Sequence, residues 1–464
     1  MTSFNSGVQP QNRTPQSIGF LLLDNFTLIS LASAIEPLRM ANQLSGRELY
    51  RWSTLSADGS QVWASDGLQV TPGASVAGPA LAYWLSRQGM HVTVVERAPA
   101  FRDGGQTIDV RGAGRVVVQR MGLEELIRAN TTHEQGIAFV DRHDRTKAFI
   151  GVNDFDGEGP IAELEILRGE LAKLLIQHSE DRVTYRFGDS IDTLHDDGQQ
   201  VHVRFAQGAE QVFDLVIVAE GIGSTTRNHV FGSEVQRRPL DVYTAYFTLP
   251  REPSDGQIMR WYNIPGGRCV CLRPDNLGTT RAFLSFQQAP NGYEKLAPDA
   301  QKSLLKQRFA DAGWETPRVL AGLDDTTDLY LEAVGQVKMP RWSKGRIALV
   351  GDTAYCASPI SGMGTSLGLC GAYVLAGELG RHADHTQAFA AYETLMRPYV
   401  AQAQGVPKFA PRLASPHSRV AIALGHAVLR LATAPVFKKL LGKFLSPKAD
   451  AIDLPDYALK RQFK

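Results

Sequence analysis

The hydrophobic positions of this chain form runs of two kinds. Nearly unbroken apolar runs occur at 91–97 (HVTVVER), 215–219 (LVIVA) and 347–350 (IALV). Such runs are typical of buried parallel strands. Apolar and polar residues instead alternate in four segments between 243 and 288, which Pro and Gly turns separate. We therefore expect an α/β protein in which an antiparallel sheet accompanies a domain of parallel strands.

The first glycine-bearing segment, GASVAGPA at 73–80, predicts a phosphate site. Gly73 and Gly78 flank a tight turn, and a helix opening at Pro79 would direct its unpaired N–H groups at a pyrophosphate. Ser75 takes the place of the middle glycine. Glu96 ends the strand HVTVVER roughly 20 residues further on, where a ribose-binding carboxylate belongs. An ordinary strand-turn-helix of small residues is the alternative for this segment alone.

Two further segments favour the same chemistry. The run LVIVA leads through an acid and a glycine to Arg227, and the run IALV leads to Asp352, at the end of the strand where α/β sheets hold ligands. A loop with Pro359, Gly362 and Gly364 then enters an apolar helix at 366–379. An aspartate there can accept hydrogen bonds from ribityl hydroxyls, and the helix N-terminus can stabilise charge on a reduced ring. The three segments together predict an FAD-binding oxygenase.

From Gly73 to about Gln404 the chain resembles the single-component class A flavin monooxygenases, and within them the tetracycline destructases. The resemblance rests on GASVAGPALAYWL with VTVVER, GGQTIDVRG (104–112), EILRGEL (165–171) and KGRIALVGDTAYCASPISGMG (344–364). It implies a Rossmann-like FAD-binding domain, an antiparallel substrate sheet that roofs the flavin, and a C-terminal helical segment. NADPH or NADH would reduce the FAD, and O₂ would supply one oxygen atom to an aromatic or polycyclic small molecule.

The resemblance also implies which residues hold the cofactor. Gly73, Ser75 and Gly78 would contact the pyrophosphate, Glu96 the adenosine ribose, Arg168 the ribityl and phosphate region, Asp352 the ribityl chain, and Pro359, Gly362 and Gly364 the surroundings of the isoalloxazine ring. Side chains with a catalytic role stay unknown, and no metal is expected.

The chain departs from the family pattern in three places. Glu220 stands where the family prefers Asp, and Met363 and Ser366 replace a more usual Gln and Asn near the ring. Upstream of Gly73 the lead-in SDGLQVTP has few large apolar residues and ends in Pro72, which lacks the N–H that a central strand needs. We expect the usual first strand to be missing.

The N-terminal region has a character of its own. Residues 1–16 are polar and predict a disordered tail. The pattern then predicts strands at 18–24 and 50–56, a helical stretch at 28–44 and a hairpin-like segment at 61–70. The segment IGFLLLDNFTLISLASAIEPLRMAN resembles the opening of the amidotransferase-like sensing domain of AraC-type regulators. This resemblance implies a truncated α/β fragment, residues 17–72, fused to the oxygenase.

Composition narrows the class of protein. The 464 residues contain 49 basic and 48 acidic side chains, so no general field attracts nucleic acid. Four scattered cysteines are too few for a disulfide framework and predict buried thiols. The first residues lack a signal sequence, and the apolar stretch at 418–432 is too short to span a bilayer. We expect a cytoplasmic monomer.

These patterns give a division into domains. We expect a tail at 1–16, the regulator-like fragment at 17–72, an FAD-binding domain at 73–230 and 336–404, a substrate domain at 231–335 and C-terminal helices at 405–464. Within the last region, the basic segment VFKKLLGKFL could lie on a membrane surface or pack across the two domains. The leading hypothesis is an FAD-dependent, NAD(P)H-consuming monooxygenase that hydroxylates a phenolic or polycyclic compound, tetracycline being one candidate. The alternatives are a ligand-binding or regulatory fusion protein and a defective fusion, both with an impaired flavin site.

Overall fold

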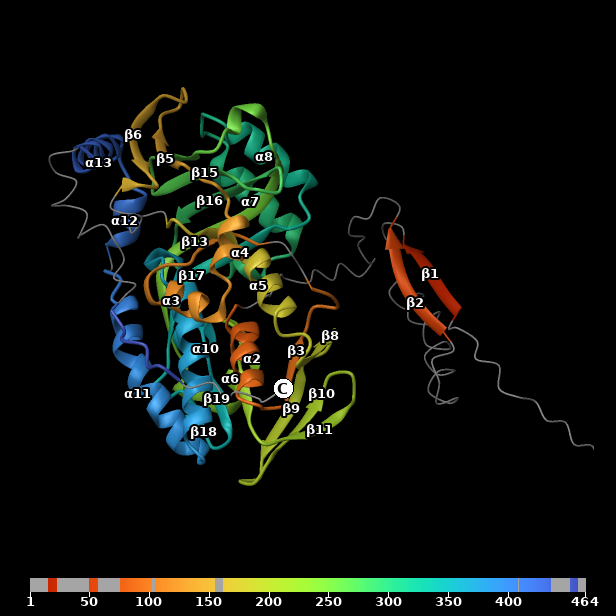
Figure 1. Ribbon diagram of the computed structural model, residues 1–464. Coiled ribbons are helices and arrows are strands. Elements are labelled where there is room, and N and C mark those ends of the chain that lie inside the picture. Colours follow the sequence, from red (N-terminus) through yellow and green to blue (C-terminus); the bar gives the residue numbers. More distant parts are fainter. Residues whose placement is uncertain are drawn as a thin grey trace, which may run out of the picture. The chain divides into compact units, whose positions relative to one another are not determined.

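A computed structural model describes residues 16–22, 50–56, 76–101, 105–154, 162–407, 409–434 and 451–457. The chain divides into two compact units, residues 1–71 and 72–464. In the first unit, β1 (Gln16–Leu22) pairs in parallel with β2 (Tyr50–Ser56), so strands are present at both predicted places (Figure 1). β1 begins two residues before the predicted start at 18, so Gln16 belongs to a strand and not to the predicted tail. The helix predicted at 28–44, residues 1–15 of the predicted tail and the hairpin at 61–70 lie outside the described residues.

The second unit contains two groups of parallel strands. β12 (Val216–Val218) pairs in parallel with β19 (Ile347–Leu349), and β18 (Ser343–Lys344) extends that sheet. β3 (Val92–Glu96) pairs in parallel with β8 (Val183–Phe187). The three apolar runs are thus strands, as predicted. Within the described residues no strand joins β3 to β12, and the weak lead-in that ends at Pro72 lies outside them.

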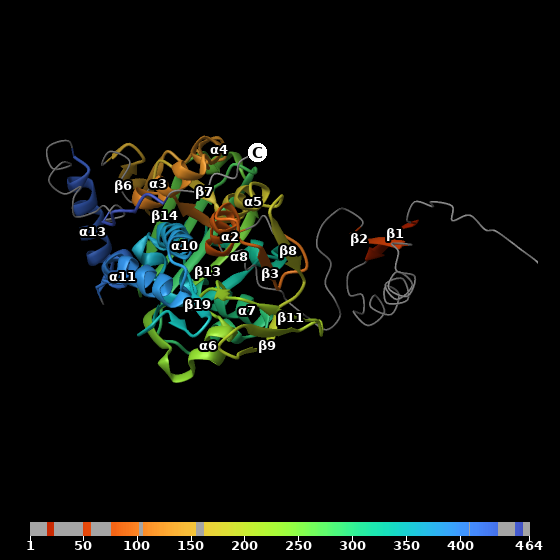
Figure 2. The same cartoon turned by 60° about the horizontal axis from the view of Figure 1, so that its bottom comes forward.

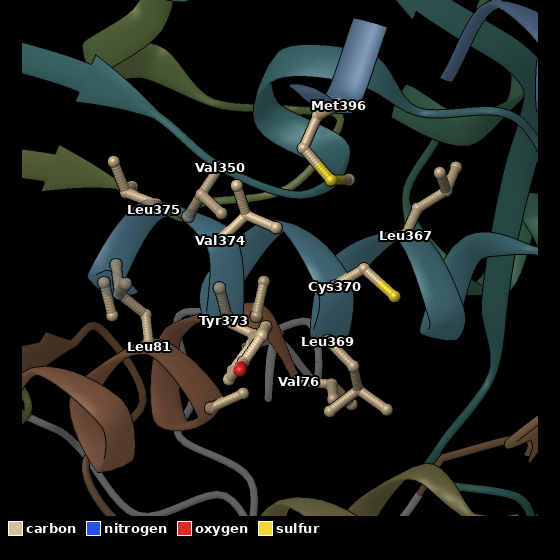
Figure 3. Packing of buried hydrophobic residues seen from close by; sticks show 14 of the residues in the cluster. Val76, Leu81, Val350, Leu367, Leu369, Cys370, Tyr373, Val374, Leu375 and Met396 are labelled. Atoms are coloured by element: carbon tan, nitrogen blue, oxygen red, sulfur yellow. The ribbon is translucent and has the colours of Figure 1, made fainter. Parts of the chain in front are cut away.

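The core of this unit is built around α10 (Gly364–Arg381), which packs against α2 (Ala77–Arg87), α3 (Gly112–Met121) and α11 (His385–Ala403) (Figures 1 and 2). Its sequence is apolar all round, so it can be buried on every side. Figure 3 shows Val76 and Leu81 on one side of the helix and Val350 and Met396 on the other. The glycines of α10 allow this close approach, because a Cβ added at Gly368 would already contact Ala77.

The alternating segments form a seven-stranded sheet in the order β17-β13-β16-β15-β14-β5-β6. Its strands are β5 (Gly136–Val140), β6 (Thr146–Gly151), β13 (Gln236–Pro250), β14 (Met259–Ile264), β15 (Arg268–Pro274), β16 (Thr279–Gln287) and β17 (Tyr330–Lys338). The four predicted strands are confirmed, and β5 and β6 join them from the first half of the chain. Helices α7 (Pro298–Phe309) and α8 (Thr316–Asp325) cover one face, where Tyr243 and Phe247 are buried.

The second unit contains further helices and strands. They are β4 (Thr107–Asp109), α4 (Glu124–Ala129), β7 (Glu165–Leu167), α5 (Arg168–Gln177), β9 (Ile191–Asp196), β10 (Val201–Phe205), β11 (Glu210–Phe213), α6 (Thr225–Phe231) and α9 (Asp352–Tyr355). Short 3-10 turns lie at Gly232–Glu234, Pro253–Asp255, Tyr293–Lys295 and Pro359–Ser361.

The C-terminal segment covers the other face of the large sheet. Asn263 donates its side-chain amide to the carbonyl of Ala414 at 2.9 Å, and Gln287 donates to that of Ser415 at 2.7 Å. These bonds hold α12 (Ala410–Ala414) and the start of α13 (Arg419–Ala432), which packs beside β6 (Figure 1). The basic segment VFKKLLGKFL lies outside the described residues. In the part of the chain that is described, no helix is both long and apolar enough to cross a membrane.

The junction between α2 and β19 depends on a glycine. Gly351 has a φ of +65°, and a Cβ added there would lie 2.8 Å from that of Ala77. We expect Gly351→Ala to lower the free energy of unfolding by about 2–4 kcal/mol, about 1–3 from a backbone conformation (φ +65°, ψ −145°) that is essentially restricted to glycine and the rest from overpacking. Urea denaturation measures this. The control is Gly278→Ala, with a φ of +80° and no atom within 4 Å, which should cost only the backbone share; equal losses in both variants would contradict the packing argument.

Candidate flavin site

The three glycine-bearing segments, far apart in sequence, meet at the ends of β12 and β19. The backbone N–H of Gly221 donates to Oγ1 of Thr353 at 2.8 Å, and Nη1 of Arg227 donates to the carbonyl of Thr353 at 3.0 Å. The first segment reaches the same place, since a Cβ at Gly78 would contact Ala219 at 3.6 Å. The structure therefore brings the three glycine-bearing segments together.

The middle segment is held by its own polar side chains. The Glu220 carboxylate accepts hydrogen bonds from Oγ of Ser224 at 2.6 Å and from the N–H of Thr226 at 3.1 Å, at the start of α6. Glu220, which stands where the family prefers Asp, thus accepts a hydrogen bond from an otherwise unpaired backbone N–H at the start of α6. Arg227 is fully buried, and burial lowers its pKa to about 10. Both side chains hold the turn in place.

The third segment leaves its polar and glycine positions open to a ligand. Asp352 begins α9 and keeps an exposed surface, as do Pro359 and Gly364. Surrounding protein nevertheless raises the pKa of the Asp352 carboxyl, against the opposing effects of hydrogen bonding to Cys356 and the charge of Arg168. A Cβ at Gly364 would meet no atom within 4 Å, so the start of α10 is uncovered by the described residues.

Two buried polar atoms beside this loop have no hydrogen-bond partner among the described residues. One is Oγ of Ser358, whose φ of +79° is unusual for a residue other than glycine. The other is Nε of Arg168, the first residue of α5. Gly105 makes room for this guanidinium, since a Cβ there would lie 3.2 Å from that Nε. Buried polar atoms without partners are costly, so each calls for a partner beyond the described residues, and a polar ligand is one candidate.

The remaining predicted residues fall in two groups. Gly73 and Ser75 lie outside the described residues. Gly78 lies inside the first turn of α2, which begins at Ala77 rather than at Pro79. The expected start was therefore wrong by two residues, because a proline is tolerated within the first turn, where N–H groups lack helical partners. Glu96 ends β3, and its Oε1 accepts the N–H of Ala98 at 2.8 Å, while no hydrogen bond joins Oε2 to another described residue.

Two departures from the family pattern have structural explanations. The hydroxyl of Ser366 is fully buried and donates to the carbonyl of Arg111 at 2.9 Å, where α10 crosses close to Gly114 of α3. Met363 is also buried, in the core of this unit. Both side chains therefore serve packing around α10. All four cysteines are free and buried, which confirms the predicted thiols.

The uncovered groups fit FAD. Arg168 offers a cation with an unpaired donor for phosphate or ribityl oxygens, Asp352 offers an acceptor for ribityl hydroxyls, and Gly362, at a φ of +63°, and Gly364 let a planar ring approach the backbone. The start of α10 adds the positive end of its dipole. When bound, the flavin supplies electron transfer and oxygen activation.

The face of the large sheet opposite helices α7 and α8 lies beside this site. Tyr246, Tyr330 and Glu332 are half-buried there. Burial raises the pKa of both tyrosines and raises the pKa of Glu332 to about 7. The alternation along 243–250 places Tyr243 on one face of its strand and Tyr246 on the other without deciding which face is buried, and the sequence patterns named above include no strand at 330–338. The sequence feature that indicates this strand is the segment YLEAV (330–334), in which the acid Glu332 stands among apolar residues.

An open hollow of about 500 Å³ lies elsewhere, on β9, β10 and β11, where Leu194, Val203 and Val212 help to line it. None of its lining residues belongs to the three glycine-bearing segments. The flavin site remains the candidate for chemistry, because two unpaired buried polar atoms, of Arg168 and Ser358, accompany the raised carboxyl pKa of Asp352 there.

The fold and site define an FAD-dependent oxidoreductase of the monooxygenase type. Residues 71–405 match the family described as FAD binding domain, and the chain belongs to this family. It is 40% identical over 339 residues to an uncharacterised protein of Mycobacterium tuberculosis, covering 72% of this chain and 91% of that protein. It is 35% identical over 422 residues to the flavin-dependent monooxygenase eupH of Phoma sp, covering 83% and 96%. Among solved structures, tetracycline destructase Tet(55) is similar with a TM-score of 0.69 and 33% identity, covering 83% of this chain and 97% of that one.

Proposed function

We propose that this flavin enzyme consumes NADPH and O₂ to hydroxylate an electron-rich phenolic or polycyclic small molecule, with tetracycline as the first compound to test. The observation that carries the proposal is the half-buried aromatic and acidic sheet face beside Arg168 and Asp352. The similarity to tetracycline destructases Tet(51) and Tet(55) supports the choice of compound.

The aromatic face suits a flat substrate. The rings of Tyr246 and Tyr330 are nearly parallel at 6.4 Å between centroids, and Phe283 lies 6.0 Å from Tyr246. On the next strands Trp261 and Phe283 meet edge to face at 5.1 Å. Aromatic surfaces of this kind bind planar rings through dispersion and quadrupole contacts. The C-terminal segment covers part of the same face, and we propose that it shields the substrate from water.

We assign the flavin-binding roles to side chains of this chain. Arg168 would hold the phosphate and ribityl region, Asp352 the ribityl hydroxyls and Glu96 the adenosine ribose, with Gly73, Ser75 and Gly78 on the pyrophosphate. The supporting observations are the unpaired Nε of Arg168 and the open surface of Asp352. The regulator-like origin of residues 17–72 is part of the proposal, and the parallel pairing of β1 with β2 is compatible with it.

Incubation of the FAD-loaded protein with NADPH, O₂ and tetracycline should yield a product heavier by one oxygen atom, measured by mass spectrometry. NADPH oxidation should rise above its substrate-free rate. Reactions without NADPH, and reactions with catalase to remove free peroxide, are the controls. If NADPH consumption stays at its substrate-free rate and the drug is unchanged, tetracycline is not the substrate. If a panel of phenols gives the same result, the hydroxylase assignment fails and a ligand-binding role becomes the better hypothesis.

A further inference from the structure

Glu332 is an acidic residue placed on an aromatic face by strand register. β17 pairs antiparallel with β13, so that Glu332 lies opposite Thr244 and Tyr330 lies opposite Tyr246. Because side chains alternate along strands, these four residues share one face of the sheet. The other face carries the core under α7 and α8. Glu332 therefore points away from that core.

The carboxyl of Glu332 is joined to the aromatic pair. The hydroxyl of Tyr330 donates to its Oε2 at 3.3 Å, and hydrogen bonding by Tyr246 also stabilises its charged form. Further along β17, the side-chain amide of Gln336 donates to the carbonyl of Ala357 at 3.1 Å. This bond fixes the strand against the loop that follows Asp352. The carboxyl thus lies between the aromatic face and the flavin-binding loop.

The charged and titratable groups that face Glu332 come from α5, α9, β13 and β17 itself. Arg168 of α5 favours its ionised form, whereas Asp352 of α9 opposes it, and the tyrosines on β13 and β17 stay neutral because burial raises their pKa. The Cys356 thiol, whose pKa burial also raises, interacts with the same carboxyl and stays neutral. The single cation, Arg168, thus faces the two carboxyls of Glu332 and Asp352. Desolvation has the largest effect on the Glu332 carboxyl and raises its pKa to about 7. The carboxyl can gain and lose a proton near neutral pH.

We propose that Glu332 is the acid–base group of the substrate site, which binds an acidic phenol or enol hydroxyl and takes up its proton. This inference rests on the proposed function. The substrate O–H bond breaks, a new O–H bond forms on Glu332, and the electron pair remains on the substrate oxygen. The more electron-rich ring carbon then reacts more readily with an electrophilic oxygen. Arg168 and the neutral tyrosines cannot accept this proton.

The first test measures the carboxyl itself. Infrared titration of the FAD-loaded protein, over two pH units on either side of neutrality, should show a protonated-carboxyl band that disappears near neutral pH and is absent from Glu332→Gln. Tyr330→Phe removes a bond to the ionised form, so the midpoint should move to higher pH. Added 4-nitrophenol should perturb the band. A wild-type band that survives in Glu332→Gln, or that 4-nitrophenol leaves unchanged, would overturn the inference whatever the enzyme oxidises.

The second test uses turnover of phenols with different intrinsic pKa values. In the wild type, kcat should rise through a midpoint near neutral pH that is the same for every phenol. In Glu332→Gln, kcat at neutral pH should fall by about 10²–10⁴-fold and its midpoint should follow the phenol's own pKa. Glu210→Gln, on exposed β11, is the matched control. An unchanged profile in Glu332→Gln overturns the inference but leaves the hydroxylase function standing. Absence of any oxidised phenol in the wild type instead contradicts the hydroxylase function.

Discussion

Replacing Arg273 by alanine should destabilise the protein by about 3–5 kcal/mol, because it leaves buried carboxylates without their counter-charge. Nε of Arg273 donates to Oε2 of Glu134 at 2.6 Å, and a second nitrogen of the guanidinium pairs with Glu165. The two carboxylate side chains are 1% and 3% exposed. Arg273 lies on β15 and Glu165 begins β7, so the cluster also ties the large sheet to the flavin-binding part of the unit.

The measurement is urea denaturation at several pH values, with Arg204→Ala as the control. Arg204 pairs with Asp192 at 2.7 Å, but both side chains are about half exposed, so its loss should cost less than about 1 kcal/mol. Burial raises the pKa of Glu134 and Arg273 opposes that rise, so the variant should raise it further. A raised carboxyl pKa favours the folded state in acid and disfavours it as pH increases. The deficit of Arg273→Ala should therefore shrink on acidification, and a deficit that is small or independent of pH would show that the cluster is not a buried ion pair.

The flavin-binding architecture could be read from the sequence because its signals are local. LVIVA and IALV are short apolar runs bounded by turn residues, which favours strands, and the structure pairs them as β12 and β19. Each is followed by a glycine with positive φ, Gly221 and Gly351, which a sharp turn requires. In the structure Thr353, which follows Asp352, contacts the middle segment at Gly221 and Arg227.

The composition of the large sheet could not be read in the same way. β5 and β6 come from residues 136–151 and reach the sheet through a parallel pairing of β5 with β14, residues 259–264. No local pattern specifies a partner more than a hundred residues away. The same limit applied to the two faces of β13. Tyr243 and Tyr246 read alike in sequence, and only packing against α7 and α8 assigns Tyr243 to the core.

The polar residues of the substrate face depend on tertiary context as well. A glutamate in a strand is most simply read as solvent-exposed. The pKa of Glu332 is raised to about 7 only because β13, Arg168 and Asp352 surround this side chain. These neighbours come from three distant parts of the chain. Likewise, Ser366 reads as a candidate near the ring until the close crossing of α3 and α10 directs its hydroxyl to Arg111.

The second large effect concerns FAD retention, and it separates Arg168 from Asp352. Arg168→Ala should weaken FAD binding by about 1.5–3 kcal/mol, roughly tenfold to a hundredfold, because hydrogen bonds to charged groups contribute that much. Asp352→Ala should lose one or two neutral hydrogen bonds from ribityl hydroxyls, each on the order of 1 kcal/mol. Equilibrium dialysis with flavin absorbance measures both dissociation constants.

Lys173→Ala is the control for Arg168→Ala, because it also removes one positive charge. Asp352→Asn is the control for Asp352→Ala, because it keeps the size of the side chain. Lys173 lies on the same helix as Arg168, but its side chain is 45% exposed and its contact is the carboxylate of Glu170, at 3.9 Å. Its loss should leave FAD binding unchanged. Asp352→Asn keeps one acceptor oxygen and should bind FAD more tightly than Asp352→Ala. An Arg168→Ala protein that retains FAD as well as Lys173→Ala does would remove Arg168 from the site, because the unpaired Nε would then have no polar ligand to meet.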